Sequence, residues 1–172
     1  MSYLNYAYPQ NNYQSSIPVT SKRKQKSQSL NLAASIEPDC LWKGYPHYGY
    51  GSNPNGYSSE EVYEMVGGNI YEGFLSGEYY NSCALRLSVA LIHCGHEIPY
   101  IKDLQTNYNF KDKKRYIISA YHMKLYLEVI LGNVHEFVND VIEVEKLQNR
   151  LGNNEISILA NAYHIGIVKK DY

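Results

Sequence analysis

The stretch NSCALRLSVALIHCGHEIP, residues 81–99, decides the fold class of this chain. Apolar residues recur at helical spacing after a polar start, and a glycine and then a proline end the pattern. This predicts a helix over 82–94, capped by Asn81 or Ser82. Cys83 stands in its first turn, where unpaired N–H groups and the positive end of the helix dipole lower the pKa of a thiol below about 8.5. Cys83 is therefore the candidate nucleophile.

The other two of the three cysteines carry weaker signals. Cys94 falls on the same helix face as Cys83 but at the negative end of the helix, so we expect it to be a packing residue. Cys40 precedes the predicted helices and has no signal of its own. The odd number without CxxC spacing excludes neither one disulfide nor three free thiols, and it gives no zinc pattern. The sequence predicts no metal and no cofactor.

A nucleophilic thiol needs a base within hydrogen-bond reach. Of the six histidines, only His164 begins a strand, in a hairpin predicted from EISILA (155–160) and HIGIVKK (164–170). A rigid strand edge can lie against a helix N-terminus, which makes His164 the preferred partner of Cys83. From the residues alone, a surface histidine and an inert cysteine remain the competing interpretation.

The remaining patterns place helices before the closing sheet. Ser58 and Glu61 have capping-box spacing at the start of a short helix that a glycine ends. Further helices are predicted over 120–131 and about 137–151, and the segment RYIIS that begins at Arg115 predicts a strand. The order indicates an α+β fold.

Residues 1–36 are rich in Ser, Gln, Asn and Lys, which predicts a flexible basic arm before a folded domain over 37–172. The basic run SKRKQK lies in this arm and leaves the domain acidic, which argues against nucleic-acid binding. No apolar run approaches the roughly 18 residues that span a bilayer, so no membrane insertion is expected. The N-terminus also lacks the pattern of a secretory signal peptide.

The stretch quoted first closely resembles the pattern N-[ST]-C-A-x-R-x-S-x-A-L-x-x-x-G-x-x-I-P of the type VI secretion amidase effectors, specifically their fourth family. Other blocks agree in order: LWKGYP, VYEMVGGNI, RYIISAYHMKLYLEVILG and ISILANAYHIGIV. The resemblance covers about residues 41–168. It implies a papain-like fold of the NlpC type, in which the nucleophile helix packs on an antiparallel sheet that carries the histidine.

The resemblance also implies a function. Members are peptidoglycan endopeptidases that hydrolyse the γ-D-glutamyl–diaminopimelate amide of cell-wall stem peptides. They are made in the bacterial cytoplasm, exported by the secretion apparatus without a signal peptide, and act in the periplasm of a rival cell. A dedicated immunity protein neutralises them at home. Cys83 matches the family nucleophile and His164 its base.

The chain departs from the family pattern around the histidine. Tyr163 replaces the usual glycine before it, and Gly166 and Val168 replace the customary acidic and tryptophan positions after it. The family's third catalytic group is an aspartate further along, and Asp171 is the candidate here. On a regular strand Asp171 would lie about 23 Å from His164, so it would need a turn to reach the ring.

The expected reaction is an acyl transfer through a tetrahedral oxyanion, with the backbone N–H of Cys83 as the first candidate donor to that oxyanion. Arg86, one turn later, is a candidate for binding a substrate carboxylate or for a structural ion pair. Asn81 is a second candidate substrate contact. Two alternatives stay open: another papain-like cysteine peptidase or acyltransferase, and a degenerate binding module that has kept the fold.

Overall fold

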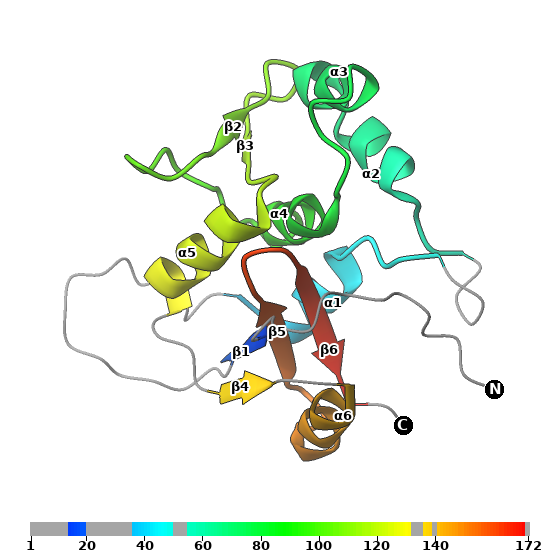
Figure 1. Cartoon of the computed structure of the whole chain (residues 1–172), viewed down its shortest axis with the longest axis vertical. Helices are drawn as coiled ribbons and strands as arrows, with labels where there is room; N and C mark the ends of the chain where they lie inside the picture. The colour runs from blue at the N-terminus through cyan, green and yellow to red at the C-terminus, as the bar shows by residue number, and fades with distance from the viewer. Residues whose placement is uncertain (1–13, 20–35, 50–54, 132–135, 139–140, 171–172) are drawn as a thin grey trace.

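The computed structural model describes residues 14–19, 36–49, 55–131, 136–138 and 141–170. Its helices are α1 (Pro38–Gly44), α2 (Ser59–Val66), α3 (Gly68–Leu75), α4 (Cys83–His93), α5 (Ala120–Leu131) and α6 (Val141–Arg150). Its strands are β1 (Gln14–Val19), β2 (Asn107–Tyr108), β3 (Arg115–Tyr116), β4 (Glu136–Val138), β5 (Ile156–Ala160) and β6 (Ile165–Lys169). The four-stranded antiparallel sheet lies below α4 and α5 in Figure 1, with α1 and α6 beside it, and this combination of helices with antiparallel strands confirms the predicted α+β class.

The main sheet has four strands in the order β4-β1-β5-β6, and every neighbouring pair is antiparallel. Helix α4 packs against β6 and α1, and α2, α3 and the small β2-β3 ribbon lie on its other side (Figure 1). The predicted hairpin is confirmed: β5 pairs with β6 from Ile156↔Lys169 to Ala160↔Ile165. His164 is the residue just before β6, in the turn rather than in the strand.

Three predicted helices are confirmed with close boundaries: α2, α4 and α5. The capping box of α2 is present in full, because the Ser58 hydroxyl accepts from the Glu61 N–H while the Glu61 carboxylate accepts from the Ser58 N–H. Gly95, with a φ of 78°, follows α4 as the predicted stop. The fourth predicted helix, over about 137–151, is shorter than expected: it is α6, and β4 occupies the first part of the predicted range.

Other elements differ from the predictions. The segment RYIIS forms a strand only at its first two residues, which pair with β2. Helix α3 was not predicted: Gly67 ends α2 as expected, but its φ of 64° turns the chain directly into a second helix. Helix α1, with a proline in its first turn, was also missed.

Strand β1 lies in the segment predicted to be a flexible arm. It pairs with β5 from Ser15↔Ala160 to Val19↔Ile156 and with β4 on its other edge. The prediction of a flexible arm over 1–36 is therefore wrong for Gln14–Val19, while 1–13 and 20–35 lie outside the described residues. The composition is polar, but backbone hydrogen bonds to two neighbouring strands do not depend on composition.

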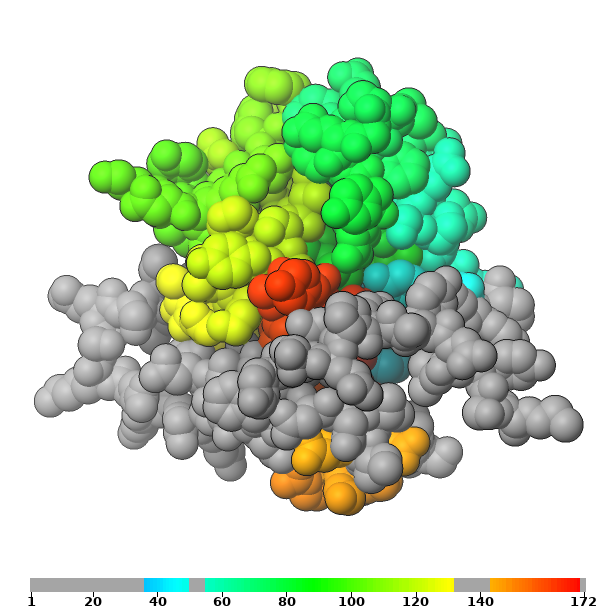
Figure 2. Space-filling model, in the orientation of Figure 1, coloured from blue at the N-terminus to red at the C-terminus, as the bar shows by residue number. Residues whose placement is uncertain are grey.

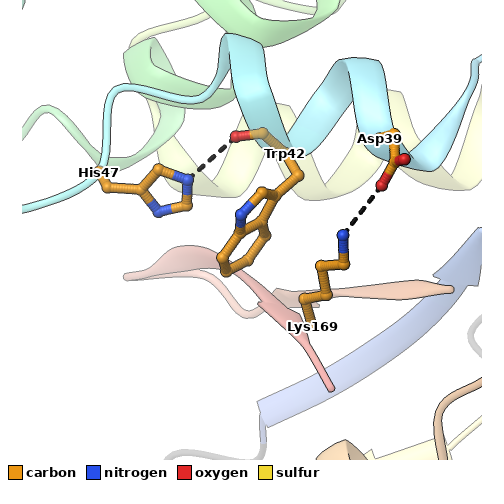
Figure 3. Close-up of polar contacts among 4 residues, drawn as sticks. All are labelled: Asp39, Trp42, His47 and Lys169. Carbon is orange, nitrogen blue, oxygen red and sulfur yellow. Dashed lines mark hydrogen bonds and ion pairs between the residues drawn. The ribbon is translucent and has the colours of Figure 1, made fainter. Parts of the chain in front are cut away.

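Helix α1 is fastened at two points. A disulfide joins Cys40 to Cys94, the residue after α4, with the two Cα atoms 5.8 Å apart. Asp39 pairs with Lys169 at the end of β6 at 2.9 Å (Figure 3), and this contact lowers the pKa of the Asp39 carboxyl. Cys94 is thus a bridging residue as well as one packed against the core. Of the possibilities left open for the three cysteines, one disulfide and one free thiol is the outcome.

Candidate active site

Cys83 is the first residue of α4 and the free cysteine of the chain, and its side chain is only 1% exposed. The side-chain oxygen of Asn81, two residues earlier, accepts a hydrogen bond from the Cys83 N–H at 3.0 Å. Ser82 is the N-cap residue, although its hydroxyl makes no capping bond. The Asn81 oxygen would have to leave the Cys83 N–H before this N–H could donate to an oxyanion, and that expected role stays a prediction.

His164 is positioned by the turn between β5 and β6. The side-chain oxygen Oδ1 of Asn161 accepts from the backbone N–H groups of Tyr163 and His164, both at 2.7 Å, which fixes the turn. Tyr163 is 67% exposed, and the orange-red residues of this turn reach the surface beside the yellow helix α5 (Figure 2). His164 itself is half-buried.

The start of α4 and this turn meet at the thiol. The Cys83 sulfur lies in hydrogen-bonding position to the backbone N–H of Ile165, the residue after His164. The Asn81 amide also donates to the Tyr163 carbonyl at 3.4 Å. The structure therefore brings Asn81 and Cys83 beside the backbone on either side of His164, while a catalytic pairing of the Cys83 and His164 side chains stays a prediction. Within the described residues, no hydrogen bond joins the thiol to the imidazole.

The Nε2 atom of the His164 ring lies near Gly166. A Cβ added to Gly166 would lie 3.7 Å from the His164 Nε2 atom, an ordinary contact distance. No polar side chain in the described part of the chain forms a hydrogen bond with the ring, and burial lowers the pKa of His164. The candidate orienting group, Asp171, lies outside the described residues, so its role stays a prediction.

The pKa of the Cys83 thiol is raised, whereas the sequence predicted that it would fall. Burial is the largest cause, since it disfavours the thiolate. The N–H groups of Ile165 and Ala84, the charge of Arg86 and the side chain of Asn81 act in the opposite direction but do not outweigh it. The N–H groups at the helix N-terminus favour the thiolate, but desolvation has the larger effect on the pKa of Cys83. The resting pair is therefore a neutral thiol and a neutral imidazole.

Arg86 is fully buried, with 0% exposure. Its guanidinium donates to the Ser82 hydroxyl at 2.9 Å, to the Pro46 carbonyl, and to the Tyr57 carbonyl at 2.8 Å. It also lies 3.7 Å from the centre of the Tyr48 ring. These partners are all neutral, so the described residues form no ion pair here, and the burial leaves no exposed guanidinium for a substrate carboxylate. The geometry instead ties the first turn of α4 to the loop that follows α1.

The sequence interpretation assigned no role to two buried tyrosines that lie near the thiol. Both Tyr45 and Tyr63 interact electrostatically with Cys83. The Tyr63 hydroxyl donates to the Asn81 carbonyl at 3.0 Å, whereas the Tyr45 hydroxyl is buried and has no partner in the described residues. The only sequence signal for Tyr45 was its place in the family-like block LWKGYP.

The described residues contain no group of three or more His, Cys, Asp or Glu side chains that could hold a metal ion. Nor does any helix in the described ranges have the length and apolar content needed to cross a membrane.

Comparison with known families gives one clear match. The family model described as type VI secretion system (T6SS), amidase effector protein 4, matches residues 79–167, just over half of the chain. The match includes both the cysteine helix and the histidine turn. No curated protein matches the sequence significantly.

Solved structures of the effector Tae4 are similar in fold. The complex of Tae4 and Tai4 from Salmonella typhimurium is 20% identical, with 79% of this chain and 83% of that chain covered and a TM-score of 0.60. The Tae4–Tai4 complex from Enterobacter cloacae is 22% identical, with 78% and 81% covered and a TM-score of 0.59. A structure of the Enterobacter cloacae effector Tae4 is 25% identical, but that alignment spans only 56% of each chain, at a TM-score of 0.48.

Proposed function

Because this chain belongs to the family of type VI secretion system amidase effector protein 4, we propose that it uses Cys83 and His164 to cut the γ-D-glutamyl–diaminopimelate amide of peptidoglycan stem peptides. Membership makes the protein a peptidoglycan amidase and an antibacterial effector that acts in the periplasm of a target cell. It also favours the amidase over the acyltransferase, protein-peptidase and binding-module alternatives. The catalytic domain is assigned to 37–172, together with β1.

One observation carries the assignment of the two residues. The sulfur of Cys83 faces the backbone N–H of Ile165, so the nucleophile lies against the turn that holds His164. In the proposed role, the imidazole rotates about its own side-chain bonds so that a ring nitrogen meets the thiol. Catalytic hydrogen bonds are often long in a free enzyme and shorten when substrate binds, so the unbonded resting geometry is compatible with this role.

The reaction begins with proton transfer, because both groups are neutral at rest. His164 takes the proton of the Cys83 thiol while the sulfur attacks the amide carbonyl, and a tetrahedral oxyanion forms. The imidazolium then gives its proton to the departing amine, and the carbon–nitrogen bond breaks. Water attacks the resulting thioester with His164 again as base, which frees the acyl group as a carboxylic acid and restores the thiol.

Other residues support these two. Asn81 holds the start of α4 to the turn through its bonds to Cys83 and Tyr163, and its exposed side chain can also contact a bound stem peptide. Arg86 supplies a positive charge that lowers the pKa of Cys83 and so favours the thiolate during attack. Asp171 remains the candidate for orienting the imidazole.

The partners follow from the family. The related effectors from Salmonella typhimurium and Enterobacter cloacae form complexes with the immunity protein Tai4. We infer that a cognate immunity protein neutralises this chain in the cell that makes it. We also propose that the chain is made in the cytoplasm and exported through the secretion apparatus without a signal peptide.

Digestion of purified sacculi tests the function directly. The wild-type protein should release stem-peptide fragments with a newly exposed diaminopimelate amine, detected by chromatography and mass spectrometry. Cys83→Ala and His164→Ala should release none while keeping the wild-type circular dichroism spectrum. His122→Ala, on α5, serves as the matched histidine control and should digest normally. Fragment release by Cys83→Ala at the wild-type rate would overturn the assignment.

A further inference from the structure

The small β2-β3 ribbon and the loop before it carry a row of three exposed aromatic rings with an arginine among them. The Arg115 guanidinium carbon lies 5.2 Å from the centre of the Tyr100 ring and 5.3 Å from that of the Tyr108 ring. The ring centres of Tyr108 and Phe110 are 5.4 Å apart. Tyr100 is 69% exposed and Phe110 is 75% exposed. We call these four side chains the ribbon strip, and the proposed reaction at Cys83 makes no use of it.

The loop that presents Phe110 is held in place on both sides of this residue. The Asn69 side chain on α3 donates to the Tyr108 carbonyl at 2.9 Å and accepts from the Phe110 N–H at 3.0 Å. The Asn109 side chain, which is fully buried, donates to the last carbonyl of α2 at 3.3 Å and accepts from the Lys111 N–H at 3.1 Å. The backbone is thus fixed while the phenyl ring stays in solvent. Exposed apolar side chains that gather in one place mark an interaction surface, and this one is preorganised.

The ribbon strip lies in the basic part of an acidic domain. Residues 100–116 hold five basic and two acidic side chains, whereas the rest of 37–172 holds seven basic and 15 acidic ones. Lys111, Lys113 and Lys114 are exposed, and this segment, yellow-green in Figure 2, projects at the upper left of the molecule. Among the described residues, no carboxylate forms an ion pair with any of the five basic groups. Their positive charge is therefore available to an anionic partner.

One short segment connects the ribbon strip to the active site. The Asn107 side chain on β2 donates to the Tyr79 hydroxyl at 3.1 Å. From Tyr79 the chain continues through Tyr80, which is 82% exposed, to Asn81, whose side-chain oxygen accepts from the Cys83 N–H. The ribbon and the thiol therefore lie at two ends of one connected segment. A polymer that carries many stem peptides has room to contact both.

We propose that the ribbon strip is a second peptidoglycan-binding site, which holds the polymer while one of its stem peptides reacts at Cys83. Sugar rings have apolar C–H faces that pack on aromatic rings, and the stem-peptide carboxylates attract the lysines. Neighbouring groups along the strip are 5.2–5.4 Å apart, a spacing similar to the length of one sugar unit.

A lipid surface fits the strip less well. None of its four side chains is aliphatic, and a cation stands between two of the rings. The inference rests on the proposed function for its substrate, and it adds a binding role in which no covalent bond forms or breaks.

Sedimentation with purified sacculi measures this binding. Every protein in the assay carries Cys83→Ala, so that the polymer stays intact. Tyr108→Ser/Phe110→Ser removes two exposed rings and should weaken sacculus binding by about tenfold, because the apolar contact area of both rings is lost. Tyr121→Ser/Val129→Ser on α5 is the matched control: these side chains are 50% and 54% exposed, and binding should equal that of the parent protein. Binding by the parent should also weaken as salt is added, because the lysines are exposed.

Activity separates binding from catalysis in the protein that keeps Cys83. Tyr108→Ser/Phe110→Ser should raise KM for sacculi by about tenfold and should cleave a soluble, sugar-free stem peptide with the kcat/KM of the wild type.

Three results would overturn the proposal. The first is equal sacculus binding by the ribbon variant and its parent. The second is a loss of activity on the soluble peptide, which indicates a structural role. The third is binding to phosphatidylglycerol vesicles, but not to sacculi, that depends on the two rings. Failure of the proposed function would look different: the wild type would cleave neither substrate, while ring-dependent binding to sacculi would remain.

Discussion

Removal of the Cys40–Cys94 disulfide should cost more stability than any single surface contact. The two cysteines are separated by 54 positions in the sequence. In the chain-entropy treatment, opening a loop of this length returns about 14 cal/mol/K to the unfolded chain, or about 4 kcal/mol at 25 °C. Native-state strain and residual structure in the unfolded chain reduce this figure, so about 2–4 kcal/mol is the expected loss.

The assay is equilibrium unfolding in urea, followed by tryptophan fluorescence from Trp42, which lies on α1 with Cys40 and packs against the core. Three samples are compared: the oxidised wild type, the wild type with reductant, and the double variant Cys40→Ala/Cys94→Ala. The second and third should unfold at similar, lower urea concentrations, and reductant should leave the double variant unchanged. Equal midpoints for the oxidised wild type and the double variant would refute the loop-closure reasoning. Because Cys83 is free, the double variant should still digest sacculi at low temperature.

Three further predictions follow from the site. The pKa of His164 is lowered and that of Cys83 is raised, so kcat/KM should complete its rise with pH below about pH 6.5 and stay level beyond about pH 8.5. A fall in kcat/KM well below pH 8.5 would indicate a resting ion pair instead. Arg86→Met leaves the Pro46 and Tyr57 carbonyls without donors. At about 1–3 kcal/mol for each carbonyl, urea unfolding should show a free energy of unfolding lower by about 2–6 kcal/mol. A variant as stable as the wild type would contradict this. Gly166→Asp places a carboxylate beside the His164 Nε2 atom, which should raise the imidazole pKa and move the acid limb of the same profile to higher pH; an unmoved limb would show that the ring points elsewhere.

Local patterns were enough to predict the elements that carry the site. The helix begun by Cys83 has an unbroken apolar face and a glycine stop, and the closing hairpin has two β-prone runs separated by a short turn. Each of these two signals is contained in a stretch of fewer than about twenty residues. The pairing of their ends around Cys83 and His164 came from the family resemblance and from strand geometry, rather than from periodicity.

The remaining features depend on contacts between distant residues. Strand β1 is defined by its neighbours β4 and β5, far along the chain, and not by its own polar composition. The Cys40–Cys94 bridge required knowing that α1 lies beside the end of α4. The raised pKa of Cys83 reflects burial by the whole core, which a helix-dipole argument cannot include. The unpaired buried hydroxyl of Tyr45 likewise depends on the residues that the fold packs around it, which no local pattern shows.

The central claim is that the sulfur of Cys83 becomes covalently bonded to the substrate carbonyl. Acid quench during steady-state digestion of soluble stem peptides, followed by proteolysis and mass spectrometry, measures this directly. The account predicts a thioester on the peptide that contains Cys83, with the added mass of the γ-D-glutamyl fragment. The His164→Ala variant should carry no such adduct. Turnover without any adduct on that peptide, or with the adduct on another residue, would contradict it.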